Sequence, residues 1–233
     1  MILFFPQWQG AGRGHRLDRP ARLLFNALAL DPGAGVTEVP VDPAEPLERE
    51  AGIWGRGAIL RQLTAAREAL TDKAPDRVFT LGGDCGIEVA PVAYLNARYE
   101  DFALVWLDGH ADLNTPESSP SGTFHGMPLR VLFGEGDRGF TALVPKPLGP
   151  AQVILVGVRD LDPAERDFIA QHQVTNVEVG TADIAASIVK ELAGRGVQNV
   201  YIHLDLDVLD PDAFPYMHYP APGGFSVADV TAL

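Results

Sequence analysis

The chain has 233 residues, of which 46% are hydrophobic and 21% charged, a composition typical of a globular protein and not of a disordered one. Its 31 acidic and 18 basic side chains give a formal net charge of −13, which argues against nucleic acid or an anionic membrane as a partner and favours a cationic ligand. The sequence shows neither a signal peptide nor a run of about 18 apolar residues, so we expect a cytoplasmic protein without a membrane span.

Short apolar runs alternate with longer amphipathic segments along the chain. Strands are predicted at residues 2–5, 36–41, 77–81, 102–107, 153–158 and 200–206. Helices are predicted at residues 20–30, 59–70, 86–98, 163–172 and 183–192. Strands that alternate with helices of this length indicate βαβ units, so we predict the α/β class, with three αβα layers and a mainly parallel sheet. No repeat or linker divides the chain, which favours a single domain over residues 1–233.

Three of the predicted strands run directly into polar clusters: Gly82-Gly-Asp-Cys-Gly86, Asp108-Gly-His-Ala-Asp112 and His203-Leu-Asp-Leu-Asp-Val-Leu-Asp-Pro211. In open α/β sheets, ligands bind at the carboxyl ends of the strands. Alternate residues of a strand face the same side, which predicts that the following side chains converge: Asp108, His110 and Asp112, and likewise Asp205 and Asp207.

These four carboxylates would repel one another strongly unless cations neutralised them. Carboxylate oxygens with an imidazole suit Mn²⁺ or a similar divalent ion, and bridging carboxylates suit a pair of ions. A lone Asp-x-Asp motif is often only a loop start or a helix cap. The presence of two such motifs, Asp108-x-His110-x-Asp112 and Asp205-x-Asp207, each at the end of an apolar strand, favours metal binding.

Four motifs resemble, in order and spacing, those of the arginase/agmatinase (ureohydrolase) family, which has the arginase–deacetylase fold. They are Gly82-Gly-Asp-Cys85, Asp108-Gly-His-Ala-Asp112, Ser121-Gly-Thr-Phe-His-Gly126 and the segment from His203 to Pro211. The resemblance implies an arginase-like domain in which a hydroxide that bridges two Mn²⁺ ions hydrolyses a guanidino or amidino C–N bond. An arginine-like substrate giving urea and an amine fits best, and the same family also includes agmatinase, guanidino-acid hydrolase and formimidoylglutamase.

The resemblance also implies roles for individual residues. Asp108 and Asp205 would bridge the metal ions, His110 and Asp207 would bind one of them, and Asp112 the other. His125 would be a catalytic proton shuttle to the leaving amine, alongside Asp112 in the catalytic machinery. Asn114 and Ser121 would hold the substrate's α-carboxylate, and Asp162 its ammonium group. The alternative for Asp162 is a helix N-cap before Pro163.

The sequence departs from the family pattern at several positions. Cys85 occupies the place of a metal-binding histidine, as either a small buried thiol or a thiolate ligand, which leaves open a single metal ion, or Zn²⁺ or Fe²⁺ in place of Mn²⁺. His203 replaces a small residue and could point toward or away from the metals. The chain ends at Leu233, so the family's C-terminal helix and strand, which supply an acidic contact to the guanidinium group, are expected to be absent from this domain.

The predicted partners are a small cationic guanidino substrate and further copies of the chain, as a trimer or hexamer by family resemblance. The alternatives outside the ureohydrolases are a non-catalytic protein with the arginase fold and an impaired metal site, and a deacetylase-like hydrolase with one Zn²⁺ ion.

Overall fold

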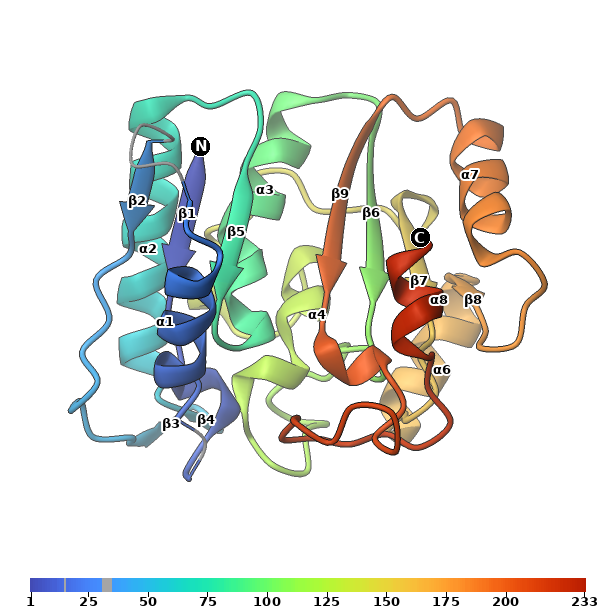
Figure 1. Ribbon diagram of the computed structural model, residues 1–233. Helices are drawn as coiled ribbons and strands as arrows, with labels where there is room; N and C mark the ends of the chain where they lie inside the picture. Colours follow the sequence, from blue (N-terminus) through green and yellow to red (C-terminus); the bar gives the residue numbers. More distant parts are fainter. Residues whose placement is uncertain (15, 31–34) are drawn as a thin grey trace. The chain divides into compact units, whose positions relative to one another are not determined.

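A computed structural model describes residues 1–14, 16–30 and 35–233 (Figure 1). The chain divides into two compact units, each built from two stretches of sequence. The first unit comprises Met1–Leu95 and Asn114–Pro147, and the second comprises Asn96–Leu113 and Leu148–Leu233. That the two units form one catalytic domain stays a prediction.

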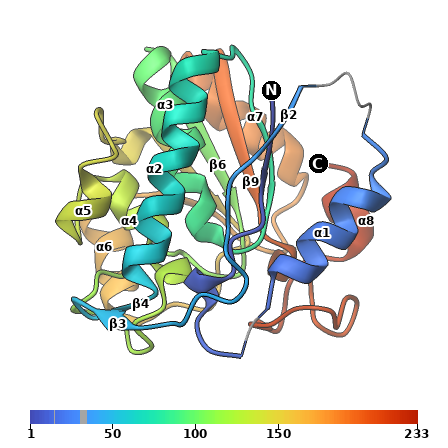
Figure 2. The same cartoon turned by 90° about the vertical axis from the view of Figure 1, so that its left-hand side faces the viewer.

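The first unit contains a parallel sheet in the order β2–β1–β5. Its strands are β1 (Ile2–Phe5), β2 (Val36–Glu38) and β5 (Phe79–Gly82). Helices α1 (Asp18–Ala27) and α2 (Arg56–Lys73) lie on opposite faces of this sheet (Figures 1 and 2). Helix α2 buries an apolar face that includes Ile59, Leu63, Ala66 and Leu70.

Short elements complete the first unit. They are η1 (Gln9–Ala11), the antiparallel pair β3 (Arg49–Glu50) and β4 (Ile53–Trp54), η2 (Cys85–Glu88), η3 (Phe124–Gly126), α4 (Pro128–Leu132) and α5 (Arg138–Thr141). The turn between β5 and η2 requires a residue without a side chain, because a Cβ atom at Gly83 would lie 1.6 Å from the carbonyl oxygen of Gln7. Helix α3 (Val89–Arg98) follows η2 and leads into the second unit.

The second unit contains a four-stranded parallel sheet in the order β8–β7–β6–β9. The strands are β6 (Phe102–Leu107), β7 (Val153–Val156), β8 (Thr175–Val177) and β9 (Asn199–Leu204). Every residue of β6 and β7 is buried, as expected for strands covered on both faces. Helices α7 (Ile184–Gly194) and α8 (Val227–Thr231) lie on one face of this sheet and α6 (Pro163–His172) lies on the other (Figures 1 and 2). The short 3-10 helix η4 (Pro150–Gln152) precedes β7, and η5 (Leu206–Val208) follows β9.

The structure confirms the predicted α/β class and the mainly parallel sheets. Each predicted strand and helix is present, although the ends shift by a few residues. Strand β8 was not predicted, because Thr175–Val177 is too short to give an apolar pattern. Among the described residues, no helix is both long and apolar enough to cross a membrane.

Candidate metal centre

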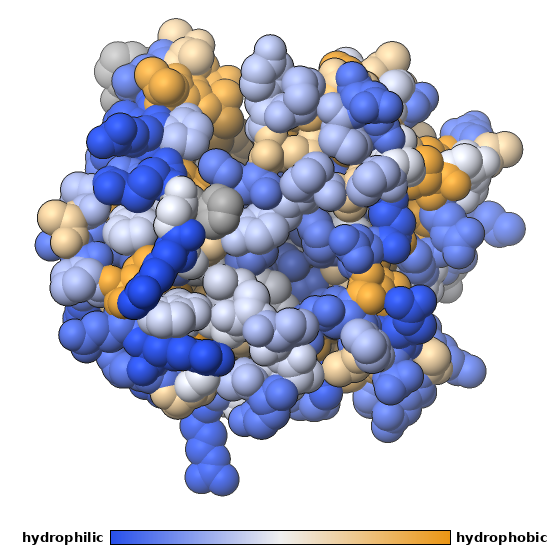
Figure 3. Space-filling view, turned by 90° about the horizontal axis from the view of Figure 1, so that it is seen from below, coloured by the Kyte–Doolittle hydropathy of each residue, from blue (hydrophilic) through white to orange (hydrophobic). Residues whose placement is uncertain are grey.

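The acidic residues of the second unit lie where two neighbouring parallel strands end. β6 and β9 pair in register, with Trp106 opposite His203 and Leu107 opposite Leu204. The amide of Asp205 donates to the carbonyl of Leu107 at 2.9 Å, which brings Asp205 beside the residues that follow β6. Figure 3 views the molecule from the end at which β6 and β9 finish, and the surface there is mostly hydrophilic.

Tight turns, and not strand alternation, bring these carboxylates together. The predicted alternation over residues 108–112 and 205–207 is wrong, because β6 ends at Leu107 and β9 ends at Leu204. Instead, Asp108 Oδ1 accepts the amide of His110 at 2.7 Å, and Asp205 Oδ1 accepts the amide of Asp207 at 2.8 Å. Each bond joins residue i to residue i+2, a turn that aspartate side chains favour.

The cross-strand contacts converge on Asp207 and His110. Asp207 Oδ1 accepts the amide of Gly109 at 2.9 Å, and His110 Nδ1 lies 3.0 Å from Asp207 Oδ2. The same nitrogen of His110 lies 3.6 Å from Asp108 Oδ1. Asp108 is almost fully buried, and the indole of Trp106 donates to its Oδ2 at 3.1 Å.

Two groups of metal-ligand type therefore form within the second unit. One donor atom from each of Asp108, His110 and Asp207 lies within 4.8 Å of the others. In a second group, the members that belong to the second unit are Asp108, His203 and Asp205, with donor atoms at the same spacing. Asp108 belongs to both groups, as expected of a carboxylate that bridges two ions. Among the described residues Asp112 falls in neither group, so its predicted place as a ligand stays a prediction.

The charges of this cluster perturb its titratable groups. Burial and then the charge of Asp108 raise the pKa of Asp112 and also that of Asp207. For Asp108 itself, burial alone would raise the pKa, but hydrogen bonds from His110 and His203 outweigh it and lower the pKa. Burial alone would lower the pKa of His110, whereas its contacts with Asp108 and Asp207 raise that pKa to about 11. The carboxylates of this cluster therefore stabilise a positive charge placed among them.

The residues present fit a divalent cation. Asp112 Oδ2 is buried and has no hydrogen-bond partner among the described residues, which is costly for a carboxylate oxygen unless a cation satisfies it. Asp112 is also held at a positive φ of 53°, a conformation that aspartate tolerates better than most residues but that needs support from its surroundings. Carboxylate oxygens combined with imidazole nitrogens suit ions such as Mn²⁺.

The other predicted site residues belong to different parts of the chain. Asp162, in the second unit, is the N-cap of α6 and precedes Pro163, as the alternative interpretation expected. Four residues lie in the first unit, and their roles toward a substrate or metal stay predictions: Cys85 (buried, in η2), Asn114 (buried), Ser121 (exposed) and His125 (half-buried, in η3). Asn114 Oδ1 accepts the hydroxyl of Ser118 at 2.8 Å, and Ser121 Oγ lies 2.5 Å from Thr123 Oγ1.

Two supporting residues were missed by the sequence interpretation. Glu165 is buried and accepts the amides of Leu113 and Asp162, both at 2.9 Å. Its signal was available in the sequence, because an N-cap aspartate with glutamate three residues later is a capping box. Arg159 donates to the backbone carbonyls of Asp207 at 2.7 Å and of Ala221 at 2.6 Å. No sequence motif predicts these contacts.

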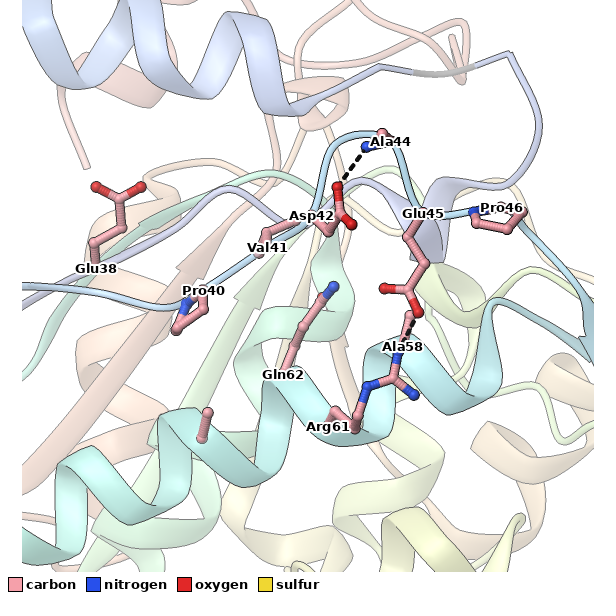
Figure 4. Close-up of a pocket in the computed structure, with 11 residues that line it drawn as sticks. Glu38, Pro40, Val41, Asp42, Ala44, Glu45, Pro46, Ala58, Arg61 and Gln62 are labelled. Atoms are coloured by element: carbon pink, nitrogen blue, oxygen red, sulfur yellow. Dashed lines mark hydrogen bonds and ion pairs between the residues drawn. The ribbon is translucent and has the colours of Figure 1, made fainter.

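A pocket of about 810 Å³ in the first unit is a separate feature (Figure 4). It is lined by Glu38, Asp42 and Glu45 among others, but each of these carboxylates has a partner in the same unit. Glu38 pairs with Arg22, Asp42 accepts the amide of Ala44, and Glu45 pairs with Arg61. Two of these carboxylates are thus paired with arginine and the third with a backbone amide, so the pocket does not reproduce the shared cluster of buried carboxylates in the second unit.

Comparison with known proteins gives a consistent result. The arginase family pattern matches residues 34–233. The chain is 38% identical to the arginase of Staphylococcus aureus (strain COL) over 152 residues, which are 63% of this chain and 50% of that protein. The arginase of Bacillus caldovelox is 33% identical over 207 residues, 81% of this chain and 67% of that one. The chain thus spans between half and two thirds of the length of these relatives.

The fold matches as well. The crystal structure of Entamoeba histolytica arginase in complex with L-ornithine aligns with a TM-score of 0.87 at 22% identity, over 98% of this chain and 82% of that one. The predicted arginase-like fold is confirmed, and the chain belongs to the arginase family.

Proposed function

We propose that this protein is a metal-dependent hydrolase that cleaves a guanidino C–N bond, with an arginine-like substrate that yields urea and an amine. The observation that carries the proposal is the pair of ligand groups in the second unit, which share Asp108. Membership of the arginase family, and relatives named arginase at 33–38% identity, support the same reaction.

The proposed cofactor is a pair of Mn²⁺ ions. Asp108 would bind both ions, His110 and Asp207 one of them, and Asp205 and Asp112 would complete the set. When bound, two divalent ions lower the pKa of a coordinated water enough to supply hydroxide near neutral pH. The carboxylates fix the ions in place and also attract a guanidinium cation, which is consistent with the net charge of −13.

The proposed roles outside the metal cluster follow from residue chemistry. His125 would carry a proton to the leaving amine, a task that enzymes most often assign to histidine. Asn114 and Ser121 would donate to the substrate's α-carboxylate, and Asp162 would accept from its ammonium group. The hydrogen bond from the Ser118 hydroxyl to Asn114 Oδ1 fixes the orientation of the Asn114 amide, which supports its role as a donor to the carboxylate.

The test is urea release by the full chain after incubation with Mn²⁺ and removal of loose metal. The rate of urea release is compared for L-arginine, agmatine and guanidino acids. Formiminoglutamate is assayed for the release of formamide. We expect L-arginine to be the best substrate and Asp207→Asn to lower its turnover by at least a hundredfold. Asp212→Asn, an exposed carboxylate beyond the cluster, is the matched control and should retain turnover.

The outcomes separate the alternatives. Preference for agmatine, a guanidino acid or formiminoglutamate would overturn the substrate proposal but keep the reaction class. Two bound metal ions with no product from any substrate would overturn the reaction and leave a non-catalytic metal-binding protein. Fewer than two ions per chain by elemental analysis would overturn the two-metal proposal.

Assembly and location are proposed on family membership alone. We propose a homo-oligomer, trimeric or hexameric, in the cytoplasm. Analytical ultracentrifugation of the Mn²⁺-loaded protein tests the first, and a monomeric mass would overturn it.

A further inference from the structure

His203 is fixed inside the acidic cluster. It lies on β9 opposite Trp106 on β6, and the two rings stack with their centroids 3.7 Å apart and their planes 26° from parallel. Only 4% of His203 is exposed. A buried imidazole that is stacked on an indole has little freedom to rotate, so its nitrogen atoms have defined directions.

One of those nitrogens faces the shared carboxylate. His203 Nε2 lies 3.5 Å from Asp108 Oδ2, and donor atoms of His203, Asp108 and Asp205 lie within 4.8 Å of one another. Within the second unit, these three residues offer the same kinds of ligand as His110, Asp108 and Asp207, since each set has one imidazole, one carboxylate of its own and Asp108.

We propose that His203 is a metal ligand and supplies the imidazole for the ion that Asp108 and Asp205 hold. The proposal deepens the function proposed above, because it names a ligand of the same metal centre. Each of the two ions would then have one imidazole and at least two carboxylates, with Asp112 as a further carboxylate on one of them, a donor set that suits Mn²⁺. The two departures from the family pattern offset each other. Position 85 carries a thiol in place of an imidazole, whereas position 203 carries an imidazole in place of a small side chain.

A purely structural role for His203 is the competing explanation. The ring would then only stack on Trp106 and orient Asp108. Both explanations predict that removal of the imidazole lowers metal affinity, because loss of a residue that orients a ligand costs about 10- to 100-fold. A direct bond between the metal and nitrogen distinguishes them.

The experiment is NMR of the full chain labelled with ¹⁵N-histidine and loaded with ¹¹³Cd²⁺, in which one-bond coupling reports each imidazole bound to the metal. The chain has six histidines, and we expect two to couple, those of His110 and His203. His203→Gln, whose amide can still bond to Asp108, should leave one coupled imidazole. His172→Gln, in the last turn of α6, is the matched control and should leave two.

Two coupled imidazoles in the His203→Gln protein, or only one in the unsubstituted protein, would overturn the proposal. If His203→Gln does not fold, single glutamine variants of the other five histidines replace it. Persistence of two couplings in His15→Gln, His125→Gln, His172→Gln and His218→Gln, together with loss of one in His110→Gln, would assign the second to His203. Loss of one coupling in any of the first four would overturn the assignment. Coupling does not depend on turnover, so an inert protein with a coupled His203 would overturn the proposed function alone.

Discussion

The carboxylate of Glu165 accepts the backbone amide of Leu113 through Oε1 at 2.9 Å. Its second oxygen, Oε2, accepts the amide of Asp162 at the same distance. Leu113 directly follows Asp112, so Glu165 ties the turn after β6 to the first turn of α6. Because only 4% of Glu165 is exposed, water cannot easily replace it as the acceptor of these two amides.

Glu165→Gln should therefore destabilise the protein and weaken its metal site. Glutamine keeps one acceptor oxygen but sets an NH₂ group against the other amide, so the free energy of unfolding should fall by roughly 1–3 kcal/mol. Affinity for Mn²⁺ should fall about 10-fold, because Asp112 loses part of its support. Urea denaturation and calorimetric titration with Mn²⁺ measure the two effects. Asp167→Asn, exposed on the same helix, is the control, and unchanged values for Glu165→Gln would show that the bridge has no role.

Arg159 should resist replacement by lysine. Its guanidinium donates to the carbonyls of Asp207, Ala221 and Gly157, at 2.7, 2.6 and 2.9 Å. A single ammonium group cannot span these acceptors, so Arg159→Lys should lose roughly 2–4 kcal/mol of stability. Affinity for Mn²⁺ should fall as well, since this bond holds the backbone of Asp207.

The same denaturation and titration measurements apply to Arg159→Lys, with Arg166→Lys on the exposed side of α6 as the control. A protein with full stability but weak metal binding would mean that Arg159 acts only through the metal site. If lysine preserves both properties, the carbonyl network does not support the centre.

Much of the candidate site followed from sequence because each carboxylate sits next to a predicted strand end. Asp108, His110, Asp205 and Asp207 were found in this way and lie together in the second unit. The reason given for their convergence was wrong, since short aspartate turns, and not a continued strand, orient them. Such turns depend on where the strand ends, and an apolar pattern locates that point only to within a few residues.

His203 illustrates what the sequence left open. Its position in the strand predicts a face but does not say whether that face meets solvent or the carboxylates. The answer depends on the register between β6 and β9, which places Trp106 opposite His203 and close to Asp108. Strand register is a tertiary property, and the sequence of β9 alone does not determine it.

The ion pair of Arg56 and Asp137 should give the protein a pH-dependent contribution to stability. Two hydrogen bonds of 2.9 and 2.8 Å join the side chains within the first unit. Burial alone would raise the pKa of Asp137, but the bonds from Arg56 and the amide of Gly139 outweigh it and lower the pKa. The contribution, about 1–2 kcal/mol, is therefore present above the unfolded pKa of about 4 and is lost as pH falls through the lower folded pKa.

Asp137→Asn removes this titration. The difference in unfolding free energy between the unsubstituted protein and Asp137→Asn should be largest at pH 6–7 and should shrink steadily as the pH falls below about 4. Denaturation with urea at a series of pH values measures it, with the exposed Asp167→Asn as the control. A difference that is constant from pH 7 to pH 3 would show that the carboxylate charge contributes nothing.

Cys85→His tests whether the thiol position contributes to the metal centre. Cys85 is 7% exposed, in a turn that Asp84 fixes by accepting the amides of Gly86 and Gly10 at 3.0 and 2.9 Å. A larger ring in this turn should cost about 1–3 kcal/mol of stability. Because Mn²⁺ prefers imidazole to thiolate, the same change should raise Mn²⁺ affinity if residue 85 is a ligand.

The most informative version of this substitution combines it with His203→Gln. If the two positions supply imidazole to the same ion, Cys85→His should restore much of the Mn²⁺ affinity that His203→Gln removes, although it costs stability by itself. Cys85→Ala in the same background controls for loss of the thiol and should restore nothing. Calorimetric titration of the unsubstituted protein, the two single variants and the double variant gives the coupling between the positions. Strictly additive effects would mean that residues 85 and 203 do not serve one ion.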